Sequence, residues 1–282
     1  MMPQLLALPL ILAIQGMMVP EAVYYDAKTG HAYVSNIVGE GWAKDNDGFI
    51  TRLAPDGSVE TLKWRTRTAD GPLSAPKGMC VLDGHLYCAD IDLIHRFSLK
   101  TDSSESIPIP GARRLNDLAT DGKAVFASDT ALGALFRLDK DTRKTTRLPG
   151  VPSINGITCH NSKMYGVSWD LHEIYELDPS GEADPAPFGL AENFTNLDGI
   201  EVLPNGIVIV SDFKGNKVSL VSPDHVHALT LLEVKTPADI AVDLKGHRLF
   251  VPEFQGGQVS IYSLATLFAM SGEGETPAPL EP

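Results

Sequence analysis

Cysteine, clustered positive charge and long apolar runs are all scarce in this chain of 282 residues. Its three cysteines show no CxxC spacing, which argues against a disulfide framework or a zinc site. We expect Cys80, Cys88 and Cys159 to be buried or half-buried thiols. The formal net charge is −13 without a Lys/Arg cluster, which excludes nucleic acid as a partner because such binding depends on neutralising phosphates. The apolar run at residues 4–16 is too short to span a membrane, so we expect no membrane partner.

Turn residues and short apolar segments are abundant instead. The chain has 25 Gly and 20 Pro, and no long helical period competes with its strand-like segments. Six times, an apolar segment leads through a turn into a second strand and then a third; the six first segments read VPEAVYYDAKTG, APKGMCVLDG, RLNDLATDG, INGITCHNS, LDGIEVLPNG and PADIAVDLKG. Their equivalent positions are 21, 77, 116, 155, 198 and 238, so the period is near 40 residues after a longer first interval.

A period near 40 residues built from strands alone predicts an all-β fold, a six-bladed β-propeller with four-stranded blades over residues 17–268. The longer first interval contains an insertion at 39–48, which we expect to form a loop over one face. The segment 269–282 is polar and rich in Pro, and we expect it to be disordered.

The apolar N-terminal segment, residues 1–16, has two interpretations. Residues 10–14 could supply the fourth strand of the last blade and so close the propeller, which would suit a cytoplasmic protein. Alternatively, residues 1–16 could be a signal peptide of a periplasmic or secreted protein, but no Lys or Arg precedes the apolar run. We therefore favour the closing strand.

The starts of the six first strands should form a ring around the central channel. The six ring positions are Glu21, Lys77, Asn116, Asn155, Asp198 and Ala238. Two carboxylates and two amide oxygens are hard ligands, so the ring predicts an axial divalent cation, Ca²⁺ in the first place and Mg²⁺ or Mn²⁺ as alternatives. The other interpretation is that Asn and Asp simply suit the turn into a strand. That interpretation explains Glu21 poorly.

A second ring of polar residues follows the second strands. Its members are Asn36, Asp90, Asp129, Asp212 and Glu253, with Trp169 at the equivalent position of the fourth blade. Carboxylates that follow a strand commonly accept hydrogen bonds from local backbone amides. We therefore expect this ring to be structural and assign it no chemistry.

Four short motifs carry a resemblance to a known family. They are Glu21 to Asp26 (EAVYYD), Arg114 to Asp117 (RLND), Asn155-Gly156 and Asp198-Gly199. Over residues 17–265 the chain resembles the gluconolactonase and senescence-marker (regucalcin-like) family of six-bladed propellers, and more distantly the paraoxonases and the diisopropyl fluorophosphatase type. The resemblance implies that Glu21, Asn155 and Asp198 bind the metal. It also implies that Asn116 and Arg114 face the substrate or complete the site.

Two residues depart from the family's pattern. Leu118 replaces the Gly that usually follows the R-x-N-D motif. Lys77 occupies a ring position that is not usually basic, and an ammonium beside a cation costs Coulomb energy. We expect Lys77 to pair with a substrate carboxylate or phosphate or with Glu21, or else to bend away to the channel mouth.

The resemblance implies a metal-dependent hydrolase that attacks the carbonyl of a lactone or related ester with metal-activated water. The substrate would be a small molecule. Asp198 would be a metal ligand and the general base, with Arg114 and Asn116 orienting the substrate. A phosphotriesterase-like hydrolase would use the same ligands. The alternative from another class is a non-enzymatic propeller that binds a ligand or protein, with the metal as a structural plug.

Overall fold

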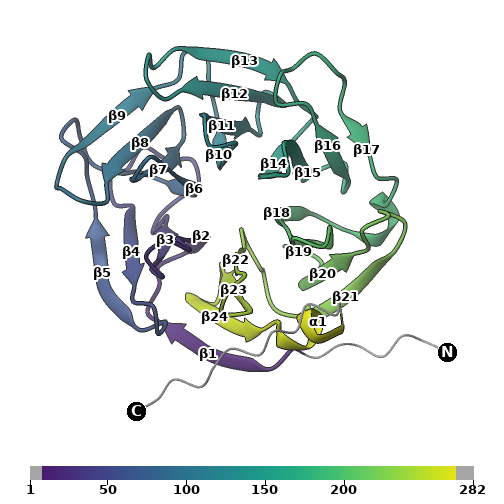
Figure 1. The fold of residues 1–282 in the computed structure, drawn as a ribbon. Helices are drawn as coiled ribbons and strands as arrows, with labels where there is room; N and C mark the ends of the chain where they lie inside the picture. Colours follow the sequence, from purple (N-terminus) through teal and green to yellow (C-terminus); the bar gives the residue numbers. More distant parts are fainter. Residues whose placement is uncertain (1–7, 271–282) are drawn as a thin grey trace.

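The computed structural model describes residues 8–270 as six four-stranded antiparallel sheets around a central axis (Figure 1). The predicted all-β six-bladed propeller with four-stranded blades is therefore confirmed. In each blade an inner strand lies beside the axis, and in blades one to five the later strands follow outward in chain order, whereas the outermost strand of blade six is β1. The outermost strands carry most of the exposed positions, as β5 does with five exposed residues in sequence.

The strands alternate with tight turns, as the Gly- and Asp-rich segments predicted. Blades one to three consist of β2 (Pro20–Tyr25), β3 (Ala32–Asn36), β4 (Phe49–Leu53), β5 (Val59–Arg65); β6 (Pro76–Leu82), β7 (His85–Asp90), β8 (Leu93–Ser98), β9 (Ser104–Pro108); and β10 (Leu115–Thr120), β11 (Ala124–Asp129), β12 (Ala134–Asp139), β13 (Thr145–Pro149). Blades four to six consist of β14 (Ile154–His160), β15 (Lys163–Ser168), β16 (Ile174–Leu177), β17 (Ala186–Pro187); β18 (Leu197–Val202), β19 (Val208–Asp212), β20 (Lys217–Val221), β21 (Ala228–Glu233); and β22 (Ala241–Asp243), β23 (Arg248–Glu253), β24 (Gln258–Ser263), β1 (Leu10–Gln15). Two short helices complete the description: η1 (Ala191–Asn193) and α1 (Ala265–Met270).

The N-terminal strand completes the sixth blade. β1 pairs antiparallel with β24, so the residues 10–14 predicted to close the ring lie in its outermost strand. Near the axis, blades six and one also meet through backbone: the Asp239 N–H donates to the Glu21 carbonyl at 2.9 Å and the Val23 N–H to the Asp239 carbonyl at 3.1 Å. Blades six and one are thus joined at both rim and axis. The predicted disordered segment 269–282 lies outside the described residues except for the end of α1.

The hydrophobic core lies between neighbouring blades. Between blades three and four, Phe126 and Leu135 pack against Ile157 and Met164, all of them fully or almost fully buried. Close packing of this kind fixes the angle between blades and with it the positions of the inner strands. None of the helices within residues 8–270 is long and apolar enough to cross a membrane.

Candidate functional site

The six predicted ring positions do come together around the axis. In blades one to five the ring residue is the second residue of the inner strand, and all five side chains are buried. The residues are Glu21, Lys77, Asn116, Asn155 and Asp198. In blade six, Ala238 lies just before β22 and contributes no polar group.

A β-bulge aims each ring side chain. In blades one to five the pairing of the inner strand with the next strand shifts register just after the first residue, as between Leu197 and Ile200 in β18. A bulge bends the strand and turns a side chain away from strict alternation. The ring residue of each blade lies in this shifted segment, which explains why all five point toward the axis.

The second polar ring positions the first. Asp129 accepts hydrogen bonds from the backbone N–H groups of Arg113 and Arg114, at 2.6 and 3.2 Å. Asp212 likewise accepts hydrogen bonds from the backbone N–H groups of Thr195 and Asn196. These amides belong to the segment that enters the inner strand, so each carboxylate fixes the backbone just before a ring residue. The second ring thus has the expected structural contacts in blades one, two, three and five, whereas Glu253 accepts hydrogen bonds from the side chains of Gln258 and Ser260.

Lys77 turns into the ring and pairs with Glu21. Its Nζ lies 3.2 Å from Glu21 Oε1, and both side chains are about 95% buried. The other carboxylate oxygen of Glu21, Oε2, is also buried but accepts no hydrogen bond from any residue in the described range 8–270. Of the positions considered for Lys77, the structure shows the pairing with Glu21.

The ring contains two buried carboxyl groups, those of Glu21 and Asp198, and one ammonium, that of Lys77. Burial raises the pKa of Glu21, and Lys77 only partly offsets this. Burial also raises the pKa of Asp198 well above its ordinary value, and the negative charge of Glu21 raises it further. Two buried carboxylates facing one ammonium leave room for an additional positive charge.

The ring forms the floor of a pocket of about 670 Å³. We call it the ring pocket. Its walls carry aromatic and cationic side chains, and the residues beyond the ring are Gly41, Trp42, Arg114, Thr130, Ala131, Ser153, Trp169, Asp170, Phe213 and Phe254. Trp42 comes from the insertion at 39–48. Its ring centroid lies 4.3 Å from Lys77 Nζ and 5.3 Å from the Arg114 guanidinium carbon, so both cations contact the same indole ring.

The aromatic wall of the ring pocket was not predicted from the sequence. Trp169 was placed in the second ring and judged structural, and Phe213 and Phe254 were not singled out. The signal was present, because Phe213 follows Asp212 and Phe254 follows Glu253, each directly after a second-ring position. A residue that follows the second strand faces the channel mouth in three consecutive blades.

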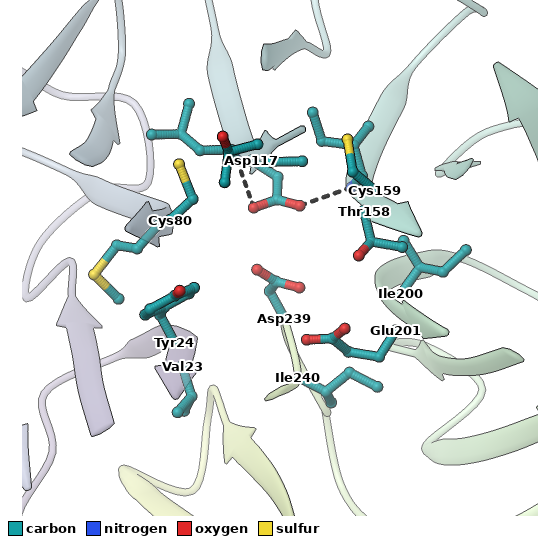
Figure 2. A pocket seen from close by; sticks show the side chains of 15 residues that line it. Val23, Tyr24, Cys80, Asp117, Thr158, Cys159, Ile200, Glu201, Asp239 and Ile240 are labelled. Atoms are coloured by element: carbon teal, nitrogen blue, oxygen red, sulfur yellow. Dashed lines mark hydrogen bonds between the residues drawn. The ribbon is translucent and has the colours of Figure 1, made fainter. Parts of the chain in front are cut away.

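A second, smaller cavity of about 180 Å³ lies farther along the same inner strands (Figure 2). We call it the acidic cavity, after the carboxyl groups of Asp117, Glu201 and Asp239 that converge in it. Asp117 Oδ2 accepts the Ile157 N–H at 2.7 Å, and its Oδ1 accepts the Leu118 N–H at 2.6 Å. The cavity wall includes no Lys, Arg or His.

Burial in the acidic cavity raises the pKa of all three of its carboxyl groups. Burial raises the pKa of Asp117 to about 7, despite the hydrogen bonds that it accepts. Burial raises the pKa of Glu201 to about 8, and the negative charge of Asp117 contributes. The pKa of Asp239 is likewise raised well above its ordinary value, first by burial and then by Asp117. The three cysteines are free, and burial raises the pKa of each thiol.

Within the described part of the chain, no group of three or more His, Cys, Asp or Glu side chains is arranged to hold a metal ion. The predicted ligand set contains only two such residues, Glu21 and Asp198, and takes its other two oxygens from amides. All four residues of the predicted set, Glu21, Asn116, Asn155 and Asp198, line one pocket.

No protein-family model matches the sequence, and no curated protein matches it. Solved structures do share its fold. One, proposed to be a gluconolactonase, superposes with a TM-score of 0.68 at 18% identity, covering 92% of this chain and 95% of its own. A luciferin-regenerating enzyme gives a TM-score of 0.63 at 16% identity over 89% of this chain and 95% of its own. The virginiamycin B lyase of Staphylococcus aureus gives 0.63 at 13% identity over 90% and 98%. The predicted likeness to gluconolactonase-like propellers is confirmed for the fold.

Proposed function

We propose that the chain is a divalent-metal-dependent hydrolase of a lactone or related ester, with its reaction centre in the ring pocket. The observation that carries the proposal is the orphaned Oε2 of Glu21, a buried carboxylate oxygen without a hydrogen-bond donor. Such an oxygen is costly to bury unless a cation meets it. The fold shared with a structure named as a gluconolactonase and with a virginiamycin B lyase supports the same conclusion.

The ring residues fit a hard divalent cation. Glu21 and Asp198 would supply carboxylate oxygens, and Asn116 and Asn155 would supply amide oxygens, which suits Ca²⁺ first and Mg²⁺ or Mn²⁺ second. Lys77 occupies Oε1 of Glu21 and leaves Oε2 free, so the ion pair and a cation can share one carboxylate. With the cation bound, the ring would carry excess positive charge, which favours an anionic transition state.

The protein's own groups would place and deprotonate the reactants. In the hydrolysis, a water oxygen bonds to the acyl carbon, the acyl C–O bond breaks, and the products are a carboxylate and a hydroxyl group. Asp198 would accept the water proton, and Arg114 and Asn116 would orient the carbonyl. A bound divalent cation would polarise that carbonyl and lower the pKa of the attacking water. Lys77 would add a fixed positive charge beside the developing oxyanion.

The deciding experiment is thermal unfolding in chelator, followed by addition of Ca²⁺, Mg²⁺, Mn²⁺ or Zn²⁺. Ligand binding to the native state raises the midpoint by mass action. We expect a rise with Ca²⁺ for the wild type and for Asp102→Ala, a control carboxylate on the surface, but none for Asp198→Ala. A wild type that no metal shifts would overturn the metal site. Assays of lactones beside phosphotriesters then identify the ester class.

A second candidate function rests on the Lys77–Glu21 ion pair. Because that pair already satisfies one carboxylate oxygen, the ring could serve as a built anion- or ligand-binding floor without hydrolysis. In this second function the ring pocket binds a small molecule but catalyses no reaction. Absence of both a metal shift and hydrolysis of any lactone or phosphotriester, with retained ligand binding, would favour it over the hydrolase.

A further inference from the structure

One wall of the ring pocket is a continuous aromatic surface. Trp169, Phe213 and Phe254 follow the second strands of blades four, five and six. The ring centroids of Trp169 and Phe213 are 5.3 Å apart, and those of Phe213 and Phe254 are 5.4 Å apart with the rings at 71°. All three side chains are only half-buried, so their rings form part of the pocket surface. A flat apolar group could lie against this wall and keep favourable ring geometry.

The opposite side of the pocket is cationic. Arg114 is exposed at the mouth, its side chain forms no ion pair within residues 8–270, and its guanidinium carbon lies 5.3 Å from the ring centroid of Trp42. Lys77 lies deeper, beneath the same indole ring. A ligand that spans the pocket would therefore meet aromatic rings at one end and a guanidinium with free donors at the other.

The two hydroxyl side chains of the wall already donate hydrogen bonds within the protein. The Thr130 hydroxyl donates to the Ile154 carbonyl at 2.9 Å. The Ser153 hydroxyl donates to the Asp170 carboxylate. A sugar lactone brings several hydroxyl groups, each of which needs a hydrogen-bond partner when it leaves water. The aromatic wall offers such hydroxyls few partners, whereas an aromatic ring needs none.

We infer that the ring pocket selects lactones or esters that carry an aromatic ring, in preference to polyhydroxylated sugar lactones. The aromatic ring lies on the wall formed by Trp169, Phe213 and Phe254, and the ester carbonyl points toward Arg114 and the ring floor. This inference rests on the proposed hydrolase, since it names the substrate class of the same site. The wall is a specificity element, and its residues take no part in bond breaking.

Binding can be measured without any turnover, in Ca²⁺-loaded wild-type protein. Two of the three tryptophans, Trp42 and Trp169, line the ring pocket, so their fluorescence reports on its occupant. We expect 3-phenylpropionate to bind at least about fivefold more tightly than gluconate or hexanoate, the gain from one or two aromatic contacts. Phe213→Leu keeps an apolar side chain but removes the ring, and should abolish this preference. Phe188→Leu, whose ring stacks on His225 outside the pocket, is the matched control and should retain it.

Turnover is then compared for a δ-lactone fused to a benzene ring, for δ-valerolactone and for glucono-δ-lactone. We expect the highest kcat/KM for the aromatic lactone, with the advantage lost in Phe213→Leu and kept in Phe188→Leu. Glucono-δ-lactone as the best substrate, or equal binding of 3-phenylpropionate and gluconate, would overturn the inference and leave the hydrolase standing. Selective, Phe213-dependent binding of 3-phenylpropionate without hydrolysis of any lactone would uphold the ligand class and overturn the proposed hydrolase instead.

Discussion

The ring pocket and the acidic cavity are built on the same inner strands, one or a few residues apart, yet they treat charge in opposite ways. Asn116 faces the ring and Asp117 the cavity, and in β18 Asp198 faces the ring and Glu201 the cavity. The ring has two carboxylates, Glu21 and Asp198, together with Lys77, and the wall of the same pocket adds Arg114 and Asp170. The acidic cavity has three carboxyl groups and no cationic side chain on its wall.

The carboxyl groups of the ring pocket therefore lie among cationic side chains, whereas those of the acidic cavity do not. In the ring, the ammonium of Lys77 favours ionised carboxylates and opposes the effect of burial. In the cavity only hydrogen bonds oppose the effect of burial, which raises the pKa of Asp117 and of Glu201. An anionic transition state could be stabilised only at the ring. Replacing a charged residue of the ring pocket should therefore have a different effect from replacing one of the acidic cavity.

The largest expected effect is on turnover, from loss of the ring carboxylate. Asp198→Asn keeps an oxygen that can face a cation but cannot accept the water proton at neutral pH. We expect kcat to fall by about 10³-fold, within the range for a lost general base. Metal-dependent stabilisation, measured as the unfolding midpoint with and without Ca²⁺, should be weakened but still present.

The matched variant lies in the acidic cavity. Glu201→Gln removes a carboxyl group three residues away in the same strand, and kcat should stay within about twofold of the wild type because the group touches no substrate. Unchanged turnover in Asp198→Asn, or an equal loss in both variants, would contradict the division of labour between the two regions.

The next effect concerns the internal cation. Lys77→Met leaves Glu21 buried without its partner, and breaking a buried pair by removing one member costs about 3–5 kcal/mol. In chelator the free energy of unfolding should fall by about that amount. Added Ca²⁺ should recover much of it, and its affinity should rise because the competing ammonium is gone. Urea unfolding with and without Ca²⁺ measures both.

The control for this variant is a lysine on the surface. Lys140 pairs with Asp83 at 2.7 Å in solvent, and Lys140→Met should leave the unfolding curve unchanged in chelator and in Ca²⁺ alike. If Lys77→Met is as stable as the wild type in chelator, the ion pair does not stabilise the ring. Lys77 would then not distinguish the ring pocket from the acidic cavity.

A smaller effect is expected where blades four and five meet between the two regions. A Cβ on Gly156 would clash with the carbonyl oxygen of Asp198, a backbone atom that cannot move alone. Gly156→Ala should cost about 1–3 kcal/mol of stability through overpacking. Gly71→Ala has open space and an ordinary backbone conformation, so it should be neutral. Chemical unfolding of both variants checks this, and equal stabilities would show that the blades can separate freely.

The ring could be predicted from the sequence because it depends only on repeat equivalence. Each of its five polar members is the second residue of an inner strand, a position that the turn spacing fixes. The channel lining beyond it could not be predicted in the same way. In strict alternation Asp198 and Glu201, three residues apart, would point to opposite faces, yet both line the channel because the register shifts between Leu197 and Ile200.

The contacts between blades could not be predicted from the sequence in full either. The position of Lys77 in the ring was predictable and its pairing with Glu21 was one of the alternatives, but the choice among them depends on the angle between blades one and two. The aromatic wall depends likewise on three loops that converge at one mouth. The Asp and Gly residues that follow the ring positions were visible in the repeats, but their structural roles could not be predicted. Asp117 accepts a hydrogen bond from the backbone of the next blade, and the lack of a side chain on Gly156 allows the next blade to approach closely.

The smallest expected effect is a change in the pH dependence of stability at the acidic cavity. The folded pKa of Glu201, about 8, lies above its ordinary value of 4.5, so the folded protein binds a proton that the unfolded chain has released over this range. The stabilising contribution is fully present below about pH 4.5 and is lost as the pH rises through about 8. Wild-type stability should therefore fall across this window.

Glu201→Gln removes the proton exchange but keeps the shape of the side chain. Relative to the wild type, the variant should gain about 1–2 kcal/mol between pH 6 and pH 9, less than the full linkage because the side chain is only partly buried. Urea unfolding at one-unit pH intervals measures the gain, and Glu182→Gln, on an exposed loop, should follow the wild-type profile. A Glu201→Gln curve parallel to the wild type would mean that Glu201 is ionised in the folded protein at neutral pH. The acidic cavity would then hold charge as the ring does, and the contrast between the two regions would have to rest on Lys77 alone.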